Sequence, residues 1–283
     1  MVQALPTKAG YQPQAEDTSI ETDAFFFHLL RQRSCTQRLQ MGTNMNRDAR
    51  LFSLASLRQI FSHLSPQHFA RKVALAWLQE ECPDNYIPSG SEMTWIQDST
   101  GLAALLHRIF AELNIPYYIT GGVAAIAYGE PRTTRDVDIV LEINRDDIDE
   151  LVKALEAAGF YVPGVEDLKA GRMQTLGVTH IETISRADLV VSGKEAFDKV
   201  KFERRRIISM PAAGELFFAS PEDLILNKLR WGRQSQSEKQ WRDVLGILKT
   251  QGTALDFEYL RSWTDTLGLT GELERALGEA GVG

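Results

Sequence analysis

Cysteine is scarce in this chain, and several familiar signals are missing from it. Two of the 283 residues are cysteines, Cys35 and Cys82, and they provide neither a disulfide framework nor a metal-ligand spacing. No run of about 18 apolar residues occurs, so the sequence predicts no membrane-spanning helix. The polar first residues lack the apolar region of a signal peptide. We therefore expect a cytoplasmic protein with reduced thiols and no membrane association.

An excess of positive charge is also missing. The chain has 31 Lys and Arg against 38 Asp and Glu, a net charge of −7 with a pI near 5.4. Because nucleic-acid phosphates are neutralised by clustered Lys and Arg, this balance excludes a general nucleic-acid binder. The densest basic run, Lys199 to Arg206, is diluted by Asp198 and Glu203. We interpret it as a solvated face, with RNA contact as the alternative.

Hydrophobic periodicity divides the chain into a helical part, a mixed part and a second helical part. We expect a flexible tail over 1–20, a helical module over 21–82 and a linker rich in helix breakers over 83–95. Strand patterns alternate with helix patterns over 96–210 and predict an α/β domain with a small mixed sheet. Residues 211–283 read as a C-terminal helical domain, whose first helix starts at Ser220-Pro221.

The most informative segment joins a glycine pair to two aspartates. Gly121 and Gly122 follow a predicted strand and precede a short helix. Asp136 and Asp138 lie two residues apart in the next predicted strand, so they share one of its faces. Two such carboxylates repel each other unless a cation lies between them, and Mg²⁺ suits hard oxygen ligands. An Asp-x-Asp alone favours a solvated strand end, but together with the glycine pair it indicates a metal site.

Several neighbouring residues are candidates for contacts with phosphate. The N–H groups of Gly121 and Gly122 can receive a triphosphate, or the pair can form an ordinary strand–helix turn. Arg132, followed by Thr134, leads into the acidic strand, and Arg132 either contacts phosphate or pairs with the two aspartates and orients them. Lys228 lies on the apolar face of a predicted helix, where a lysine either snorkels or reaches into a cleft.

These residues resemble a known motif. Gly-Gly followed by Arg-x-Thr-x-Asp-x-Asp is similar to the nucleotidyltransferases that share their catalytic fold with DNA polymerase beta, specifically the AbiEii type and its uncharacterised bacterial relatives. The resemblance runs from about residue 96 to the C-terminus. Beyond the motif it rests on the segments 201–206, 220–233 and 240–248.

The resemblance implies a reaction and a set of roles. Asp136 and Asp138 would hold Mg²⁺, or Mn²⁺ in its place, and an acceptor hydroxyl would attack the α-phosphorus of an NTP and release pyrophosphate. A third carboxylate is implied on a neighbouring strand. Asp188 matches that context and would deprotonate or orient the acceptor, with Glu182 as the fallback and a surface strand cap as the alternative. The implied nucleotide-binding residues are Gly121, Gly122, Arg132, Thr134 and Lys228.

Three hypotheses for the acceptor and role remain open. The first is transfer to RNA or protein, with the chain as the toxin half of a toxin–antitoxin pair and an antitoxin-like protein as its partner, as the AbiEii resemblance implies. The second is a small-molecule enzyme of the antibiotic-modifying kind, which a deep acidic pocket beside Asp188 would favour. The third is a non-catalytic nucleotide-binding or interaction protein that keeps the fold. We further expect Asp243 to pair with a cation of the preceding helix and His180 to be packed in a strand.

Overall fold

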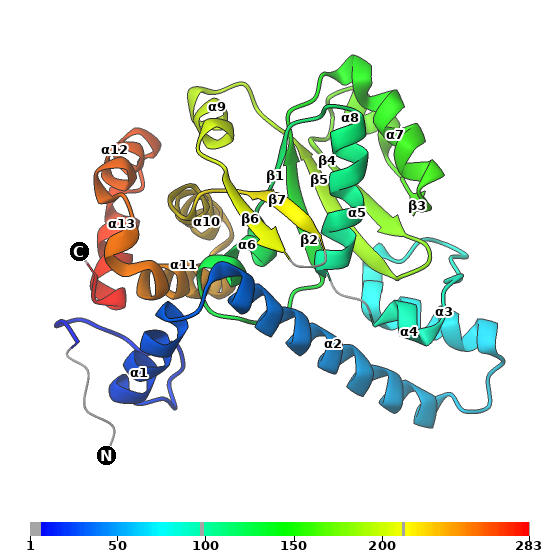
Figure 1. Ribbon diagram of the computed structural model, residues 1–283, viewed down its shortest axis with the longest axis horizontal. Coiled ribbons are helices and arrows are strands. Elements are labelled where there is room, and N and C mark those ends of the chain that lie inside the picture. Colours follow the sequence, from blue (N-terminus) through cyan, green and yellow to red (C-terminus); the bar gives the residue numbers. More distant parts are fainter. Residues whose placement is uncertain (1–6, 97–98, 211–212, 283) are drawn as a thin grey trace.

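The computed structural model describes residues 7–96, 99–210 and 213–282. Within these ranges a seven-stranded mixed sheet forms the centre, in the order β3-β4-β5-β2-β1-β7-β6 (Figure 1). Its strands are β1 (Tyr117–Ile119), β2 (Asp136–Leu141), β3 (Phe160–Tyr161), β4 (Thr175–His180), β5 (Ser185–Val191), β6 (Arg206–Met210) and β7 (Gly214–Phe218). The β2–β5 and β1–β7 pairs are parallel and the others antiparallel. The predicted mixed α/β class is therefore confirmed.

One face of the central strands is the core of the molecule. Val137, Ile139 and Leu141 of β2 alternate with less buried neighbours and are at most 1% exposed. Helix α5 (Ser99–Glu112) packs on this face, and α7 (Ile148–Ala157), with η2 (Arg145–Asp147) and α8 (Val165–Lys169), lies beside it. Because side chains alternate along a strand, this burial forces the intervening residues of β2 onto the opposite face.

The opposite face of the sheet is covered only in part. Helix α9 (Ala196–Glu203) lies over one end of it, where Phe202 packs with Tyr118 and Val140 in a small apolar cluster. Asp138 and Asp136 continue along β2 from Val140 on this same face, and both are only partly buried. The acidic end of β2 therefore lies beyond the cover that α9 provides.

Five N-terminal elements precede α5 in the chain. They are α1 (Ile20–Arg31), α2 (Cys35–Ile60), α3 (Pro66–Leu78), η1 (Gln79–Glu81) and α4 (Glu92–Trp95). The long helix α2 begins at a capping box formed by Ser34 and Gln37, and it crosses α6 (Gly121–Tyr128), where Gly42 allows the close approach of Ile126 (Figure 1). Arg38, 4% exposed, donates to the Ala127 carbonyl at the end of α6.

The C-terminal helices pack on one another, and the first two of them contact α6. They are α10 (Pro221–Ser235), α11 (Glu238–Gln251), η3 (Gly252–Ala254), α12 (Phe257–Leu267) and α13 (Thr270–Ala280). Ser220 caps α10 by accepting the N–H of Asp223, as its Ser-Pro sequence predicts. None of the described helices is long and apolar enough to cross a membrane.

Several segments differ from the sequence-based expectations. Residues 1–6 of the expected tail lie outside the described residues. The part after them packs against the rest of the protein, since Gln12 donates its N–H to the Glu279 carbonyl and Gln14 donates its N–H to Asp23. Trp95, in the expected linker, is 4% exposed. Strand β7 joins the sheet beyond the boundary expected at residue 210, because it pairs with β1, far earlier in the chain.

Candidate active site

The register of two parallel strands brings three candidate carboxylates to one face of the sheet. Asp138 of β2 lies opposite Asp188 of β5, and Asp136 lies opposite Arg186. Partners in a ladder project to the same face, as do residues two apart in one strand. Asp136, Asp138 and Asp188 therefore share the partly covered face, and Asp188 experiences the charges of both other aspartates.

The glycine pair lies directly against Asp138. The N–H of Gly122 donates to Asp138 Oδ2 at 3.3 Å. Gly121 has φ +59, in the region that favours glycine, and a Cβ there would overlap the Asp138 carboxylate. A Cβ on Gly122 would lie 2.6 Å from Thr134 Oγ1. The pair thus lets the start of α6 approach β2 closely, and one of its two N–H groups already serves Asp138.

The electrostatics of Asp138 fit a divalent cation. Burial, and after it the neighbouring Asp136 charge, raise the pKa of the Asp138 carboxyl above its ordinary value. A hard cation would relieve both effects, and Mg²⁺ is commonly held by one or two carboxylates together with substrate phosphates. No group of three His, Cys, Asp or Glu in the described part of the chain converges into a complete metal-binding cluster. The fit of Asp136 and Asp138 to such an ion therefore rests on the charge and burial of these two carboxylates.

Asp188 is already engaged by a cation. Arg186 Nη2 lies 2.8 Å from Asp188 Oδ1, and Nη1 of the same guanidinium lies 3.0 Å from Glu81 Oε2 in η1. Burial raises the pKa of Asp188, and the Arg186 charge opposes that rise. Sequence reasoning assigned no role to Arg186 or Glu81. The Arg-x-Asp spacing, which puts Arg186 and Asp188 on one strand face, was the sequence signal for their pairing. No feature near Glu81 in the sequence indicates that it pairs with Arg186.

Asp243 of α11 connects two other candidates. Arg132 forms a two-point pair with its carboxylate, at 2.8 Å for both Nε and Nη2, and Lys228 Nζ lies 2.7 Å from Oδ2. Lys228 also donates to Gln240. The expected pairing of Asp243 with a cation of the preceding helix is confirmed. The alternative in which Arg132 pairs with Asp136 and Asp138 is wrong, because Asp243 presents both carboxylate oxygens to its guanidinium fork.

The ion cluster of Arg132, Lys228 and Asp243 is largely buried. The Lys228 and Asp243 side chains are each 5% exposed, and that of Arg132 is 19% exposed. Although burial acts to raise it, the hydrogen bond from Arg132 and the two positive charges hold the pKa of Asp243 below its ordinary value. Lys228 also experiences the Asp138 charge. The cluster therefore places two cations next to the acidic strand, with one carboxylate between them.

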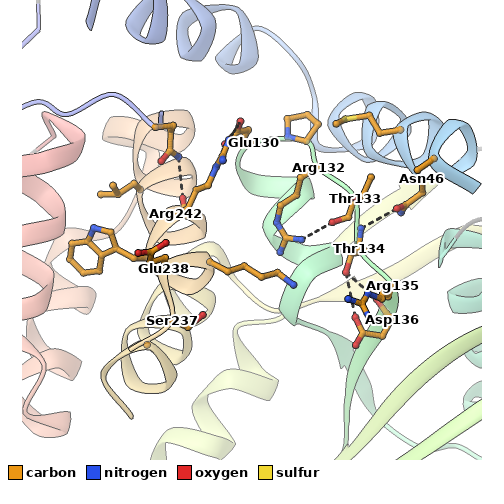
Figure 2. Close-up of a pocket in the computed structure, with 18 of the residues that line it drawn as sticks. Asn46, Glu130, Arg132, Thr133, Thr134, Arg135, Asp136, Ser237, Glu238 and Arg242 are labelled. Carbon is orange, nitrogen blue, oxygen red and sulfur yellow. Dashed lines mark hydrogen bonds and ion pairs between the residues drawn. The ribbon is translucent and has the colours of Figure 1, made fainter. Parts of the chain in front are cut away.

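A cleft of about 1700 Å³ opens in front of Asp136. Figure 2 shows Asn46 of α2 and Thr134 on one side of it and Glu238 and Arg242 of α11 on the other. Thr134 donates its N–H to Asn46 Oδ1 at 3.0 Å, and its Oγ1 lies 3.4 Å from Asp136 Oδ1. The N-terminal module therefore forms one wall of the cleft.

The cleft lining has mixed charge and includes only some of the candidates. Arg132, Thr134 and Asp136 line it, whereas Asp138, Asp188 and Lys228 are not among its lining residues. Cationic and acidic side chains line it in nearly equal numbers. The small-molecule hypothesis predicts a deep acidic pocket beside Asp188, a residue that does not line this cleft.

The remaining sequence-derived candidates lie outside the cleft. In the basic run, Lys201 pairs with Asp198, and Arg204 pairs with Glu222 and stacks on a tyrosine ring, so these charges are used in packing. His180 packs on an aromatic ring and is hydrogen-bonded to a threonine, as expected. Glu182, the fallback third carboxylate, is exposed in the turn between β4 and β5.

Solved structures similar to this chain include several nucleotidyltransferases. An antigenic nucleotidyltransferase-like protein from Paracoccidioides brasiliensis is 18% identical, with 63% of this chain and 91% of that one covered and a TM-score of 0.43. The antibiotic-resistance factor ANT(2″)-Ia is 17% identical, with 62% and 98% covered and a TM-score of 0.43. A CCA-adding enzyme in complex with ATP is 16% identical, with 59% and 47% covered and a TM-score of 0.30. No protein-family model matches the chain, and no curated protein matches it in sequence.

Proposed function

We propose that this protein is a metal-dependent nucleotidyltransferase that moves an NMP group from an NTP to an acceptor hydroxyl and releases pyrophosphate. The observation that carries the proposal is the strand register, which gathers Asp136, Asp138 and Asp188 on one sheet face against a glycine turn. Asp136 and Asp138 would hold Mg²⁺, or Mn²⁺ in its place, and the bound ion would supply charge stabilisation to the attacking oxygen and the leaving pyrophosphate.

The protein's own groups have distinct roles in this proposal. The acceptor oxygen forms a bond to the α-phosphorus while the bond from that phosphorus to the pyrophosphate oxygen breaks, and the Asp188 carboxylate accepts the acceptor's proton. The N–H groups of the Gly121–Gly122 turn at the start of α6 bind phosphate, and the Gly122 N–H leaves Asp138 Oδ2 to do so. Arg132, Thr134 and Lys228 add polar contacts to the triphosphate, and Asp243 positions the two cations.

RNA or protein is the acceptor class that we propose. The cleft holds about 1700 Å³, more than the roughly 300–1,000 Å³ of most small-molecule pockets, and its lining has mixed charge. Both features favour a macromolecular acceptor over a polycationic small molecule. Because the sequence resembles the AbiEii type, we extend the proposal to a toxin–antitoxin role. In that role an antitoxin-like protein partner controls access to the cleft.

Label transfer tests the reaction and the acceptor together. The protein is incubated with each of four α-³²P-labelled NTPs and Mg²⁺, with total bacterial RNA or a protein extract as acceptor. We expect label in one acceptor class with the wild type and none with the Asp136→Asn/Asp138→Asn variant. Asp146→Asn, which removes an exposed carboxylate away from the site, is the matched control and should label normally.

The outcomes separate the three hypotheses. Label in RNA or protein that persists in the Asp136→Asn/Asp138→Asn variant would contradict the site. Absence of label with NTP binding retained would favour a small-molecule acceptor or a non-catalytic role, and transfer to a panel of small hydroxyl compounds would separate those two.

A further inference from the structure

The third candidate carboxylate is held by a cation that belongs to the protein. The guanidinium of Arg186 lies between Asp188, at 2.8 Å, and Glu81, at 3.0 Å. The side chains of Arg186 and Asp188 are 20% and 21% exposed, whereas that of Glu81 is 57% exposed. Because a partly desolvated ion pair is screened less than one in water, the guanidinium is bound more strongly on its Asp188 side.

A glycine on the neighbouring strand provides room for this arrangement. Gly177 of β4 pairs in register with Asp188. A Cβ on Gly177 would lie 2.7 Å from Arg186 Nη2 and 3.4 Å from Asp188 Oδ1. A Cβ at position 177 would therefore force the end of the Arg186 side chain to shift. The sheet surface is therefore shaped for an arginine lying along this carboxylate.

Glu81, the second partner of Arg186, belongs to the N-terminal module, and several contacts hold that module against the sheet domain near Arg186. Tyr86 donates its hydroxyl proton to the Ile181 carbonyl at 2.8 Å, and Ile184, 1% exposed, belongs to the apolar cluster of the module. Gln79, two residues before Glu81, accepts a hydrogen bond from Arg135 at 2.6 Å. The module is thus held against the β4–β5 turn, and η1 itself is held against the segment before β2.

From these contacts we infer that Arg186 is a resident counter-ion of Asp188 and competes with a divalent cation for the carboxylates Asp136, Asp138 and Asp188. In the same inference Glu81 is a positioning residue, which draws the Arg186 guanidinium away from Asp188 when the cation binds. The inference rests on the proposed function for the metal site itself. It assigns the N-terminal module a part in loading that site, which its sequence did not indicate.

The two residues have opposite effects in this arrangement. Loss of the Arg186 charge removes the competitor. An opposite charge beside a carboxylate shifts its proton equilibrium by about tenfold or more, and we expect Arg186→Met to tighten Mn²⁺ binding by a comparable factor, about tenfold. Loss of the Glu81 charge leaves Arg186 with Asp188 alone. Because the Glu81 pair is exposed, Glu81→Gln should weaken Mn²⁺ binding by about two- to fivefold.

The experiment measures Mn²⁺ binding without nucleotide, by the electron paramagnetic resonance signal of free Mn²⁺ during titration at pH 7.5. The variants are Arg186→Met, Arg186→Lys, Glu81→Gln and the double variant, with Glu80→Gln as an exposed control for the same charge change next to Glu81. Arg186→Lys keeps a positive charge and should bind Mn²⁺ close to the wild-type value. In the Arg186→Met background, Glu81→Gln should have no further effect, because Glu81 acts through Arg186.

The sign of the changes decides the outcome. Weaker Mn²⁺ binding in Arg186→Met, or unchanged binding in Glu81→Gln, would overturn the inference, since a merely structural role predicts a loss in the first and nothing in the second. Exposed Glu81 can be replaced without disturbing the core, so its variant tests the inference even where Arg186→Met folds poorly. Mn²⁺ binding that survives Asp136→Asn/Asp138→Asn would instead show that the proposed metal site is wrong.

Discussion

Replacement of Asp243 by asparagine should destabilise the protein strongly at neutral pH. Asp243 is the carboxylate between Lys228 and Arg132, at 2.7 and 2.8 Å, and its side chain is 5% exposed. Asparagine keeps the shape but leaves both cations without a counter-charge. Breaking a buried ion pair in this way costs about 3–5 kcal/mol. For a protein of this size that loss lowers the Tm by on the order of 10 °C.

The cost should depend on pH in a defined direction. The pKa of Asp243 is lowered in the folded protein, so the ionised carboxylate is stabilised by folding. Its contribution is fully present above the unfolded pKa of about 4 and is lost as the pH falls through the lower folded value. The difference between wild type and Asp243→Asn should therefore stay constant from pH 7 to about 5 and shrink below pH 4.

Urea unfolding followed by circular dichroism between pH 7 and pH 3 measures this difference. Lys228→Met should cost less than Asp243→Asn, because Asp243 then keeps its two-point pair with Arg132. The exposed control Asp146→Asn should change the free energy of unfolding by less than about 0.5 kcal/mol. A loss below about 1 kcal/mol at pH 7, or a difference that widens toward acid pH, would refute the assignment of Asp243 as the central anion.

Two further predictions concern residues that shape the site. Gly121→Ala should abolish Mn²⁺ binding as well as lower the Tm, because a Cβ there overlaps the Asp138 carboxylate. The control Gly214→Ala, at φ +77 with open space around it, should cost only the backbone strain of about 1–2 kcal/mol. Equal effects of the two substitutions on Mn²⁺ binding would contradict the overlap. Arg38→Met removes a buried donor 2.8 Å from the Ala127 carbonyl and should cost about 1.5–3 kcal/mol in thermal unfolding, and an unchanged Tm would show that this contact does not support α6.

Local spacing in the sequence predicted the central elements of the site. The alternation in Asp136 to Leu141 predicts a strand with its carboxylates on one face, and the structure has that strand with that burial pattern. Gly159, the second residue after α7, has φ +85, the left-handed conformation that glycine commonly adopts at a helix end. Each of these features depends on residues within a few positions of one another, so the sequence contains the information needed.

Interactions between distant residues were not predictable in the same way. Arg132 and Asp243 are 111 positions apart, and the sequence offered the nearby Asp136 and Asp138 as equally suitable partners. Strand β7 is short and its sequence has no clear strand signal. It is part of the sheet because it pairs with β1 and β6. The charge of Arg204 in the basic run was visible in the sequence, but its partner Glu222 on α10 was not.

The sequence by itself determined the α/β class and the presence of a glycine turn followed by two carboxylates on one strand face. These follow from the periods of the helix and the strand, which act over a few residues. Only the tertiary structure decided that Asp188 lies in register with Asp138, that Arg186 and Glu81 accompany it, and that Asp243 gathers Lys228 and Arg132. Ion pairs form with whichever opposite charge the packed chain brings within about 4 Å, and many residues of each sign are available, so the choice is made by packing.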